Sequence, residues 1–359
     1  MTSIENLRSS QSEFDNNLNI RSLGVETDPQ SGIRTHYLEI EDLDEAPNLE
    51  ARMFIQGVID DQDLVLQENP EWLAPSFDRK TKEIVLQNEV SKSLYGEDNP
   101  ALLEWARSMM TAKALYPLQR PYSTHLPGVT KDNEPLLNGV EIDANSRQFL
   151  LHGLDAIGIR TRAVVMADLV KKYYRADEQN RWVSLACGAA VPVLDSLKCV
   201  EDNKNVSLDL IDIDQDALNF ADRLASEQGL EKNQHYTLHQ SNLVKELIIS
   251  DRLVDSMGEK SAQIVDMMGI FEYFEHPQAV KMMKNAYRLV DDGGVLIAAN
   301  MLSSRPQLAF NQRGVGWPGI YPRSTEELAA IIDDAGIDKE NVDIYIPTDG
   351  IYAIIELRK

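Results

Sequence analysis

The sequence is short of basic residues and of cysteine. It holds 35 lysines and arginines against 58 aspartates and glutamates, which gives a formal net charge of −23 over 359 residues. A chain this acidic repels phosphate backbones, so we expect neither DNA nor RNA as a direct partner. The two cysteines, Cys187 and Cys199, form no metal-binding pattern. We therefore expect no metal site and no disulfide.

Long hydrophobic runs are also lacking. No apolar stretch approaches the roughly 20 residues of a membrane span, and MTSIENLRSS at the start does not have the form of a signal peptide. Together with the low cysteine content, this favours a cytoplasmic protein without a membrane span. The hydrophobic content of 43% is ample for a core, and the length allows one large domain or two.

A complete GxGxxG turn is missing, but a related pattern is present. Residues 182–197 begin as an apolar strand, break into the small residues ACGAA at 186–190, and resume as the apolar face of a helix. Small residues let a ligand lie against the backbone, and the helix N-terminus offers unpaired N–H groups. Gly188 is the one glycine in this turn, whereas a glycine-rich turn has several. A buried strand, turn and helix that binds no ligand is therefore as good an interpretation of this segment as a nucleotide-binding one.

A second predicted strand at 207–213 ends with an aspartate. Asp212 follows Gly188 by about 24 residues, the spacing at which a carboxylate accepts both hydroxyls of a ribose. The alternative is that Asp212 only caps the next helix. Asp214 and Asp216 can already do so, and we therefore favour ribose binding.

The rest of the C-terminal half predicts more of an α/β sheet. Five βα units, a helix and a hairpin around Asp349-Gly350 follow in order. A dinucleotide dehydrogenase would have another βαβ unit in place of the hairpin, so we do not expect NAD. The further strands are predicted at 234–239, 262–268, 295–300, 342–346 and 351–357.

In this order the motifs resemble those of class I S-adenosylmethionine-dependent methyltransferases. The resemblance covers roughly residues 160–359 and rests on LACGAA, LIDIDQDAL, SNL, MMGIFEYF and LVDDGGVLIAAN. It implies an α/β, Rossmann-like sheet of seven strands with a terminal antiparallel hairpin, and S-adenosylmethionine as the cofactor. GIFEYF, LIAAN, Trp317 and YPRS at 321–324 are similar to methyltransferases of hydroxy-fatty-acid methyl ester biosynthesis.

The sequence departs from that family at several positions. Ser184 stands where the family usually has an acidic residue, and Ala186 and Ala190 stand where it usually has glycine. Asn242 replaces the acidic adenine contact, although its carbonyl can still pair with an adenine amino group. These departures imply weaker cofactor contacts and keep a scaffold without turnover among the alternatives.

The resemblance assigns the cofactor site to the ends of the first four strands. Its predicted residues are Ala186, Cys187, Gly188, Asp212, Ile213, Asn242, Leu243, Met267 and Gly269. Methyl transfer is an in-line displacement and needs a base only when the acceptor is protonated. Glu272, Tyr273 and His276 are the candidates for acid–base or orienting work. The alternative is that they pack, or precede the helix that begins at Pro277.

The acceptor is expected beyond the fourth and fifth strands. The predicted acceptor-binding residues are Asn300, Trp317, Arg323, Tyr122 and His125. The last two belong to the proline-rich segment 117–139, which has no clear period and which we interpret as a lid or pocket wall. The alternative is that this segment only packs on outer helices.

We thus predict two domains. Residues 1–145 form a mainly helical N-terminal accessory or lid region, which the resemblance does not cover, and residues 146–359 form the methyltransferase core. The predicted function is S-adenosylmethionine-dependent methyl transfer to a small-molecule or lipid-like acceptor. The alternatives are a non-catalytic S-adenosylmethionine-binding protein, and a protein or RNA methyltransferase that acts with a partner. The oligomeric state stays open.

Overall fold

The computed structural model describes residues 19–40, 49–78, 81, 83–109, 111–120, 136–137, 140–200, 205–317 and 319–359. The chain divides into two compact units. The sheet unit comprises Met1–Glu41, Thr161–Ser304 and Ile320–Lys359, and the helical unit comprises Asp42–Arg160 and Arg305–Gly319. Each unit thus draws on segments that are distant in the sequence, unlike the predicted single boundary between residues 145 and 146.

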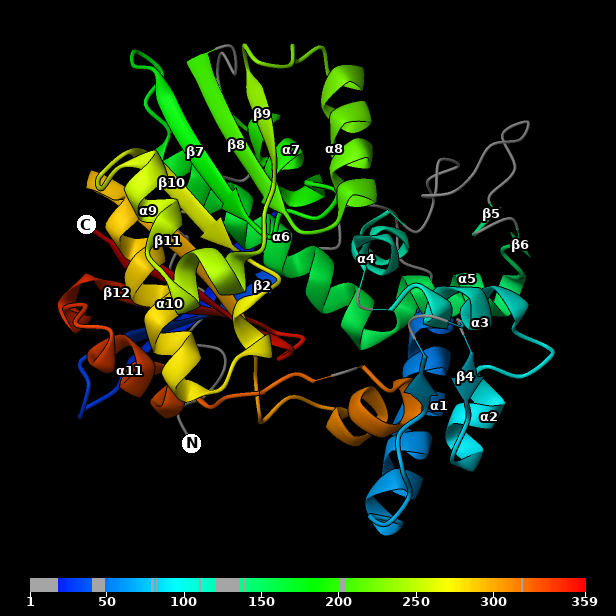
Figure 1. The fold of residues 1–359 in the computed structure, drawn as a ribbon. Helices are drawn as coiled ribbons and strands as arrows, with labels where there is room; N and C mark the ends of the chain where they lie inside the picture. The colour runs from blue at the N-terminus through cyan, green and yellow to red at the C-terminus, as the bar shows by residue number, and fades with distance from the viewer. Residues whose placement is uncertain are drawn as a thin grey trace. The chain divides into compact units, whose positions relative to one another are not determined.

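The sheet unit is built on one mixed sheet of nine strands in the order β1-β2-β12-β13-β11-β10-β7-β8-β9 (Figure 1). The predicted count of seven strands was therefore too low, because β1 and β2 extend the sheet beyond β12. The strands are β1 (Ile20–Thr27), β2 (Arg34–Ile40), β7 (Asn180–Leu185), β8 (Val206–Asp212), β9 (Tyr236–Gln240), β10 (Ala262–Met267), β11 (Val290–Met301), β12 (Val342–Pro347) and β13 (Tyr352–Arg358).

The strand order reverses at β7. Strands β7, β8 and β9 run outward in one direction, whereas β10 and β11 lie on the other side of β7, and all five are parallel. Strand β13 then pairs antiparallel with both β11 and β12. In open α/β sheets, ligands bind beyond the carboxyl ends of the strands where the order reverses. The position between β7 and β10 is therefore where a site is expected.

Local sequence explains where the helices of this unit begin. Asp214 accepts a hydrogen bond from the Asp216 backbone at the start of α8, and Ser324 with Glu327 forms a capping box at the start of α11. Pro277 lies in the first turn of α10, where its missing N–H costs nothing. The helices are α7 (Val191–Leu197), α8 (Gln215–Glu227), α9 (Arg252–Met257), α10 (His276–Leu289), α11 (Thr325–Asp334) and most of α6 (Leu154–Tyr173), with the π-helix η4 (Val244–Ile249) and the 3-10 helices η5 (Phe271–Tyr273) and η7 (Lys339–Asn341).

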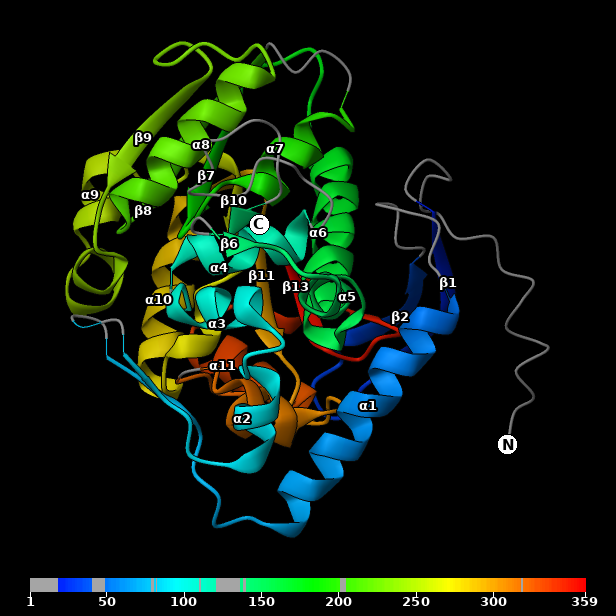
Figure 2. The same cartoon turned by 90° about the vertical axis from the view of Figure 1, so that its right-hand side faces the viewer.

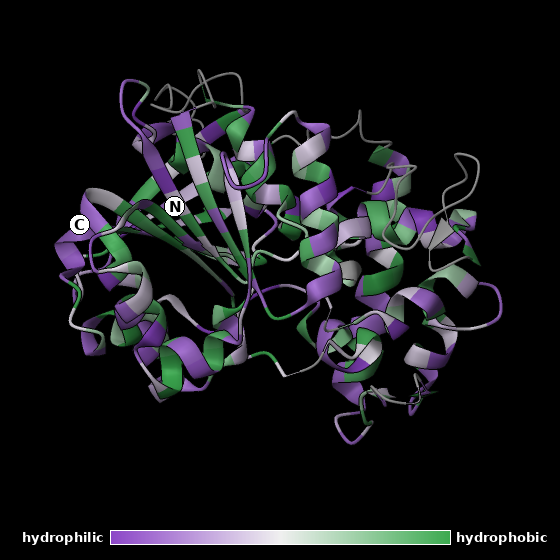
Figure 3. Ribbon diagram, turned by 45° about the horizontal axis from the view of Figure 1, so that its top comes forward, coloured by the Kyte–Doolittle hydropathy of each residue, from purple (hydrophilic) through white to green (hydrophobic). Residues whose placement is uncertain are grey.

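One hydrophobic core joins α10 and α11 to the sheet. Met282, Met283 and Leu289 of α10 and Ile331 of α11 are fully buried against strands β10, β11, β12 and β13. These helices are apolar toward the sheet and polar on the opposite side, and the colouring of Figure 3 displays this mixture. This packing places the loops that follow β10 and β11.

Charged residues hold the added strands at the sheet edge. The buried Asp343 of β12 accepts two hydrogen bonds of 2.7 Å from the Arg34 guanidinium of β2 and one from Arg358 of β13. His36 Nε2 lies 3.0 Å from its Oδ1. Burial by itself would raise the pKa of Asp343, but hydrogen bonds from His36, Arg34 and Arg358 hold it well below its ordinary value.

A second buried acid ties α6 to the same edge. Glu356 of β13 is fully buried and accepts a hydrogen bond of 2.7 Å from Lys172 Nζ and one of 2.6 Å from the Tyr345 hydroxyl. Tyr173 also donates to Glu356. Both acids are thus neutralised by named partners, which is what burying a carboxylate requires.

The helical unit has its own aromatic core. The ring of Phe149 packs between those of Trp105 and Phe310, with centroids 5.9 Å and 6.3 Å apart. Figure 2 shows the ribbon of the helices α1, α2, α3, α4 and α5 of this unit in a second view. The elements are α1 (Leu49–Glu68), α2 (Glu89–Leu94), α3 (Pro100–Arg107), α4 (Ala112–Gln119), α5 (Ala144–His152), the first turns of α6 and the π-helix η6 (Phe310–Val315), with the short strands β3 (Ser76–Phe77), β4 (Ile84–Val85), β5 (Leu136–Leu137) and β6 (Val140–Glu141).

The segment after β11 belongs to the helical unit because its polar groups are satisfied there. The buried Asp63 of α1 accepts a hydrogen bond of 2.6 Å from the Phe310 backbone. Arg313 donates to two carbonyls at the end of α1, those of Leu66 and Asn69. None of the helices in the described ranges has the length and apolar character that crossing a membrane requires.

We predict that Asp343→Asn lowers the free energy of unfolding by about 3 kcal/mol at pH 7, the scale for breaking a buried ion pair. The folded pKa of Asp343 is depressed, so its ionised form stabilises the fold above the unfolded pKa of about 3.9. This contribution is lost as pH falls through the folded pKa. Urea unfolding of both proteins between pH 7 and pH 3 measures it.

The matched control is Asp292→Asn, because Asp292 forms an exposed salt bridge with Lys260. The control is expected to unfold at nearly the wild-type urea concentration. If Asp343→Asn also unfolds at the wild-type concentration, the charged cluster at the sheet edge does not stabilise the sheet.

Candidate functional site

The turn after β7 has an unusual backbone. Ala186, Gly188 and Ala190 all have positive φ angles, of 56°, 56° and 55°. A left-handed conformation costs an L-residue such as alanine about 1–2 kcal/mol, and such strain persists mainly at functional sites. Two hydrogen bonds hold the turn, from Cys187 N to the Ile211 carbonyl at 3.0 Å and from Ala190 N to the Cys187 carbonyl at 2.8 Å.

These angles are ones that glycine adopts without strain, as it would at the positions where Ala186 and Ala190 stand. The backbone of this chain takes the glycine conformation, although the side chains are alanine. The departure seen in the sequence therefore leaves the shape of the turn intact and adds two methyl groups. Desolvation raises the pKa of the half-buried Cys187, with Asp212 and Asp266 adding to the effect, so this cysteine is a thiol and not a thiolate at neutral pH.

Asp212 connects this turn to the end of β8. Its Oδ2 accepts a hydrogen bond of 2.8 Å from Gly188 N, and its Oδ1 accepts one of 2.9 Å from Asp214 N. Burial raises the pKa of Asp212, while hydrogen bonds from the Asp214 and Gly188 backbones oppose the rise. A carboxylate offers about four acceptor positions, so these two bonds leave capacity for hydroxyl donors.

The residues beside Asp212 differ in exposure. Ile213 follows it directly and is 62% exposed, which is unusual for a large apolar side chain at the end of a central strand. Leu243 is buried in the core of the sheet unit. The Asn242 carbonyl oxygen accepts from the Val244 and Lys245 backbones at 3.0 and 3.3 Å, so it caps η4 and does not have the free carbonyl expected from the sequence.

The end of β10 forms the other side of the strand reversal. Met267 is fully buried in the sheet and Gly269 lies in the loop that follows. Asp266 pairs with Ser184 of β7 and Ile297 of β11, and its Oδ2 accepts a hydrogen bond of 2.7 Å from Trp182 Nε1. Burial raises the pKa of Asp266 to about 7, against the hydrogen bond from Trp182 that lowers it.

We predict that Asp266→Asn changes how stability depends on pH. Between about pH 4 and pH 7 the folded protein keeps a proton on Asp266 that the unfolded chain has lost, so wild-type stability falls as pH rises. The asparagine variant lacks this loss. Its stability relative to wild type is expected to rise across this range, by at most about 4 kcal/mol, and to level off above it.

Urea unfolding of both proteins at several pH values from 4 to 8 tests this. The asparagine side chain of the variant retains an oxygen that can accept from Trp182, so the variant is matched in shape. A stability difference that does not change with pH would mean that Asp266 is ionised in the folded protein at neutral pH.

Glu272, Asn300 and Arg323 come together in the sheet unit, but as a buried network. Arg323 Nη1 donates to Asn300 Oδ1 at 2.6 Å, and another of its nitrogens donates to the Phe274 carbonyl. Glu272 Oε2 accepts from Met301 N at 3.2 Å. Burial lowers the pKa of Arg323, with the charge of Glu272 opposing the change. The three side chains join the loop after β10 to the end of β11 and thereby position the site.

Tyr273 and His276 lie where the loop after β10 leads into α10. Tyr273 ends the short helix η5, next to Glu272. His276 begins α10, is exposed, and has Nε2 2.7 Å from Asp334 Oδ2 of α11. The contact between its imidazole and Asp334 therefore joins α10 to α11 at the surface. The described contacts do not bring His276 to Asp212 or Gly188.

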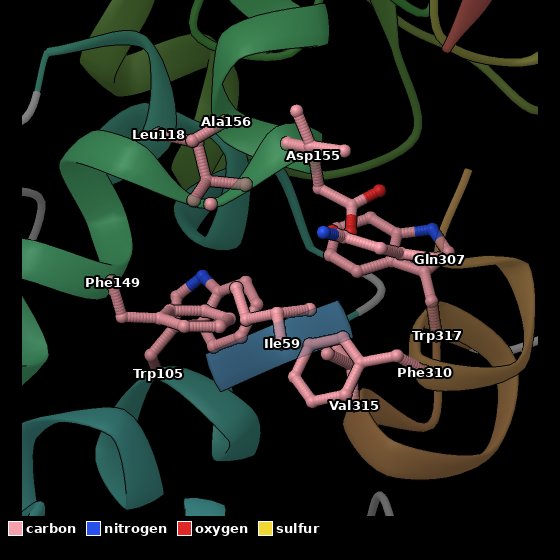
Figure 4. Close-up of a pocket in the computed structure, with 12 residues that line it drawn as sticks. Ile59, Trp105, Leu118, Phe149, Asp155, Ala156, Gln307, Phe310, Val315 and Trp317 are labelled. Atoms are coloured by element: carbon pink, nitrogen blue, oxygen red, sulfur yellow. The ribbon is translucent and has the colours of Figure 1, made fainter. Parts of the chain in front are cut away.

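Trp317 lies in the helical unit, where it lines a pocket (Figure 4). The pocket is mostly aromatic and aliphatic, and its two polar side chains are both engaged. Asp155 accepts from Asn311 at 3.0 Å, and Gln307 donates to Asp60 at 2.7 Å. The other lining residues are Ile59, Trp105, Leu118, Phe149, Gly153, Leu154, Ala156, Phe310 and Val315. Tyr122 and His125 lie outside the described residues.

Sequence reasoning missed Arg162. It lies in the helix α6 and is only 3% exposed. An arginine inside an apolar stretch, AIGIRTRAVVM, was the available signal. Within the described part of the chain, no group of three or more His, Cys, Asp or Glu side chains is arranged to hold a metal ion.

Comparison with known proteins gives similarity in structure only. No family model matches the chain, and no curated protein matches it. A possible exported protein from Bordetella parapertussis is similar over 88% of this chain and 99% of its own, with 17% identity and a TM-score of 0.56. At this identity the likeness concerns the fold, and it extends over most of the chain.

Several further similar structures are methyltransferases. An O-methyltransferase family protein from Burkholderia thailandensis is 17% identical over 58% of this chain and 60% of its own, with a TM-score of 0.42. An O-methyltransferase family 2 protein from Planctomyces limnophilus, solved with apigenin, is 18% identical over 61% and 62%, with a TM-score of 0.43.

Proposed function

We propose that this protein binds S-adenosylmethionine beside the turn 186–190 and transfers its methyl group to a small-molecule or lipid-like acceptor. The observation that carries the proposal is the bond between Gly188 N and Asp212, which joins a left-handed turn to a buried carboxylate where the strand order reverses. A nucleoside bound there meets an acceptor for its ribose hydroxyls and a backbone that it can approach closely.

Each neighbouring residue has a role in this proposal. The remaining acceptor positions of Asp212 bind the ribose hydroxyls, and the exposed Ile213 packs on one face of the adenine. The backbone of Ala186, Cys187 and Gly188 lies along the amino-acid part of the cofactor. Leu243 and Asn242 position the loop that borders the adenine, since one packs in the core and the other caps η4.

The chemistry needs alignment more than acid–base groups. A lone pair of the acceptor attacks the methyl carbon, the carbon–sulfur bond breaks, and its electrons stay on sulfur as a neutral thioether. An acceptor that arrives as an anion requires no base. Glu272 is engaged by Met301 N and faces Arg323, so we assign it and Asn300 to holding the loops around the reacting atoms.

A non-catalytic S-adenosylmethionine-binding protein is the second candidate. The observation that favours it is the pair of alanines in left-handed conformation, because their methyl groups occupy the turn against which the cofactor would lie. Binding of the cofactor without transfer to any acceptor in a broad screen would support this candidate over the first.

We predict that Ile213→Ala weakens binding of S-adenosylhomocysteine by about 5- to 10-fold, the scale for removing one or two buried CH₂ groups from the contact. The free protein exposes Ile213, so its thermal stability should not change. Titration calorimetry of wild type and variant measures the dissociation constants, with NAD as a ligand that is not expected to bind.

The matched control is Ile249→Ala. Ile249 is 74% exposed at the end of η4, and the same atoms are removed away from the proposed site. The control should bind S-adenosylhomocysteine as wild type does. If wild type binds neither S-adenosylhomocysteine nor S-adenosylmethionine at millimolar concentration, the proposed function is wrong.

A further inference from the structure

We propose that Arg162 is the binding residue for a carboxylate group at the carboxyl end of β10. The proposal rests on the function proposed above and adds the charge of the ligand to it. The carboxylate belongs either to the amino-acid part of the cofactor or to the acceptor, and the experiment below separates these two sources.

The position of Arg162 is the first part of the argument. Its Nη2 lies 3.8 Å from the point where a Cβ on Gly269 would stand. Gly269 is the second residue after the end of β10, on the side of the sheet where the order reverses. The guanidinium therefore lies at the carboxyl end of β10, and glycine at 269 leaves the space beside it free of a side chain.

The lack of a partner is the second part. The side chain is buried, and its Nη1 has no hydrogen-bond partner among the residues that the structure describes. Its guanidinium lies over the ring of Tyr352, with 4.4 Å to the ring centroid. Stacking on a tyrosine orients the guanidinium but supplies no negative charge.

Other buried arginines of the chain do have partners. Arg160 donates to the carbonyls of Leu118 and Leu151, Arg305 forms an ion pair with Asp155, and Arg323 donates to Asn300. Arg162 thus differs from them because, in the described residues, its Nη1 is left without a hydrogen-bond partner and no acidic side chain is paired with it. A buried cation without an anion is strongly unfavourable, so the arrangement is suited to a ligand that brings the anion.

A carboxylate fits this cation best. The planar guanidinium presents a fork of donors that binds the two oxygens of a carboxylate in parallel. The turn 186–190 and the end of β10 border the same reversal of strand order, so the amino-acid part of a bound cofactor and the acceptor both come close to Gly269. Either of them can supply the carboxylate.

The first arm of the test compares two nucleosides by calorimetry on wild type and Arg162→Met. S-adenosylhomocysteine has a carboxylate, whereas 5′-methylthioadenosine does not. If the cofactor supplies the carboxylate, the variant loses about 10- to 100-fold in affinity for the first and nothing for the second, the scale of a charged hydrogen bond. Arg223→Met is the matched control, because Arg223 also stacks on an aromatic ring but at the surface.

The second arm uses sodium octanoate on protein saturated with S-adenosylhomocysteine. If the acceptor supplies the carboxylate, Arg162→Met keeps both nucleoside affinities and loses octanoate binding at least 10-fold. Arg162→Lys keeps the charge but not the fork, so it should give the same pattern with a smaller loss, and it serves as the variant if the methionine protein does not fold.

Unchanged affinity for all three ligands in both folded variants would overturn the proposal. The function proposed above fails separately, when wild type binds neither nucleoside. Octanoate binding that still depends on Arg162 would in that case support the carboxylate site and reject the methyltransferase.

Discussion

The hydrogen bond between Gly188 N and Asp212 is the contact on which the candidate site depends. It joins the turn after β7 to the end of β8 and keeps the strained turn in one conformation. The carboxylate is buried and accepts hydrogen bonds from backbone donors. These bonds do not use all of its acceptor positions, so it can still accept from a ligand. The same hydrogen bond therefore stabilises the strained turn and fixes the position of the Asp212 carboxylate.

The buried ionisable groups of the sheet unit are of three kinds. The differences between them distinguish groups that stabilise the fold from a candidate ligand-binding group. Asp343 and Glu356 are neutralised by cations and hydroxyls, and they hold the sheet edge. Burial raises the pKa of Asp266 to about 7, which favours its protonated, uncharged form below that pH. Arg162 has no paired acid within the described residues and leaves its Nη1 without a hydrogen-bond partner, which is why we propose a ligand for it.

The candidate site was only partly predictable from sequence. The turn and Asp212 were found because a strand, small residues and an acid at fixed spacing describe a local arrangement. Glu272, Asn300 and Arg323 were selected as polar residues near strand ends, and whether such residues face a ligand or one another depends on side-chain packing that spacing does not encode. Arg162 was not predicted as a binding residue, because the reason to select it is the missing hydrogen-bond partner of its buried Nη1. This can be seen only when its neighbours in three dimensions are known.

The sequence by itself determined the α/β class, the caps of α8 and α11, and the succession of the core strands along the chain, because periodicity and capping are local properties. Tertiary structure decided that β1 and β2 extend the sheet to nine strands and that residues 305–319 belong to the helical unit. These outcomes depend on ion pairs and hydrogen bonds between residues far apart in the chain, such as Arg34 with Asp343 and Asp63 with Phe310. No local pattern specifies which distant partner neutralises a buried charge.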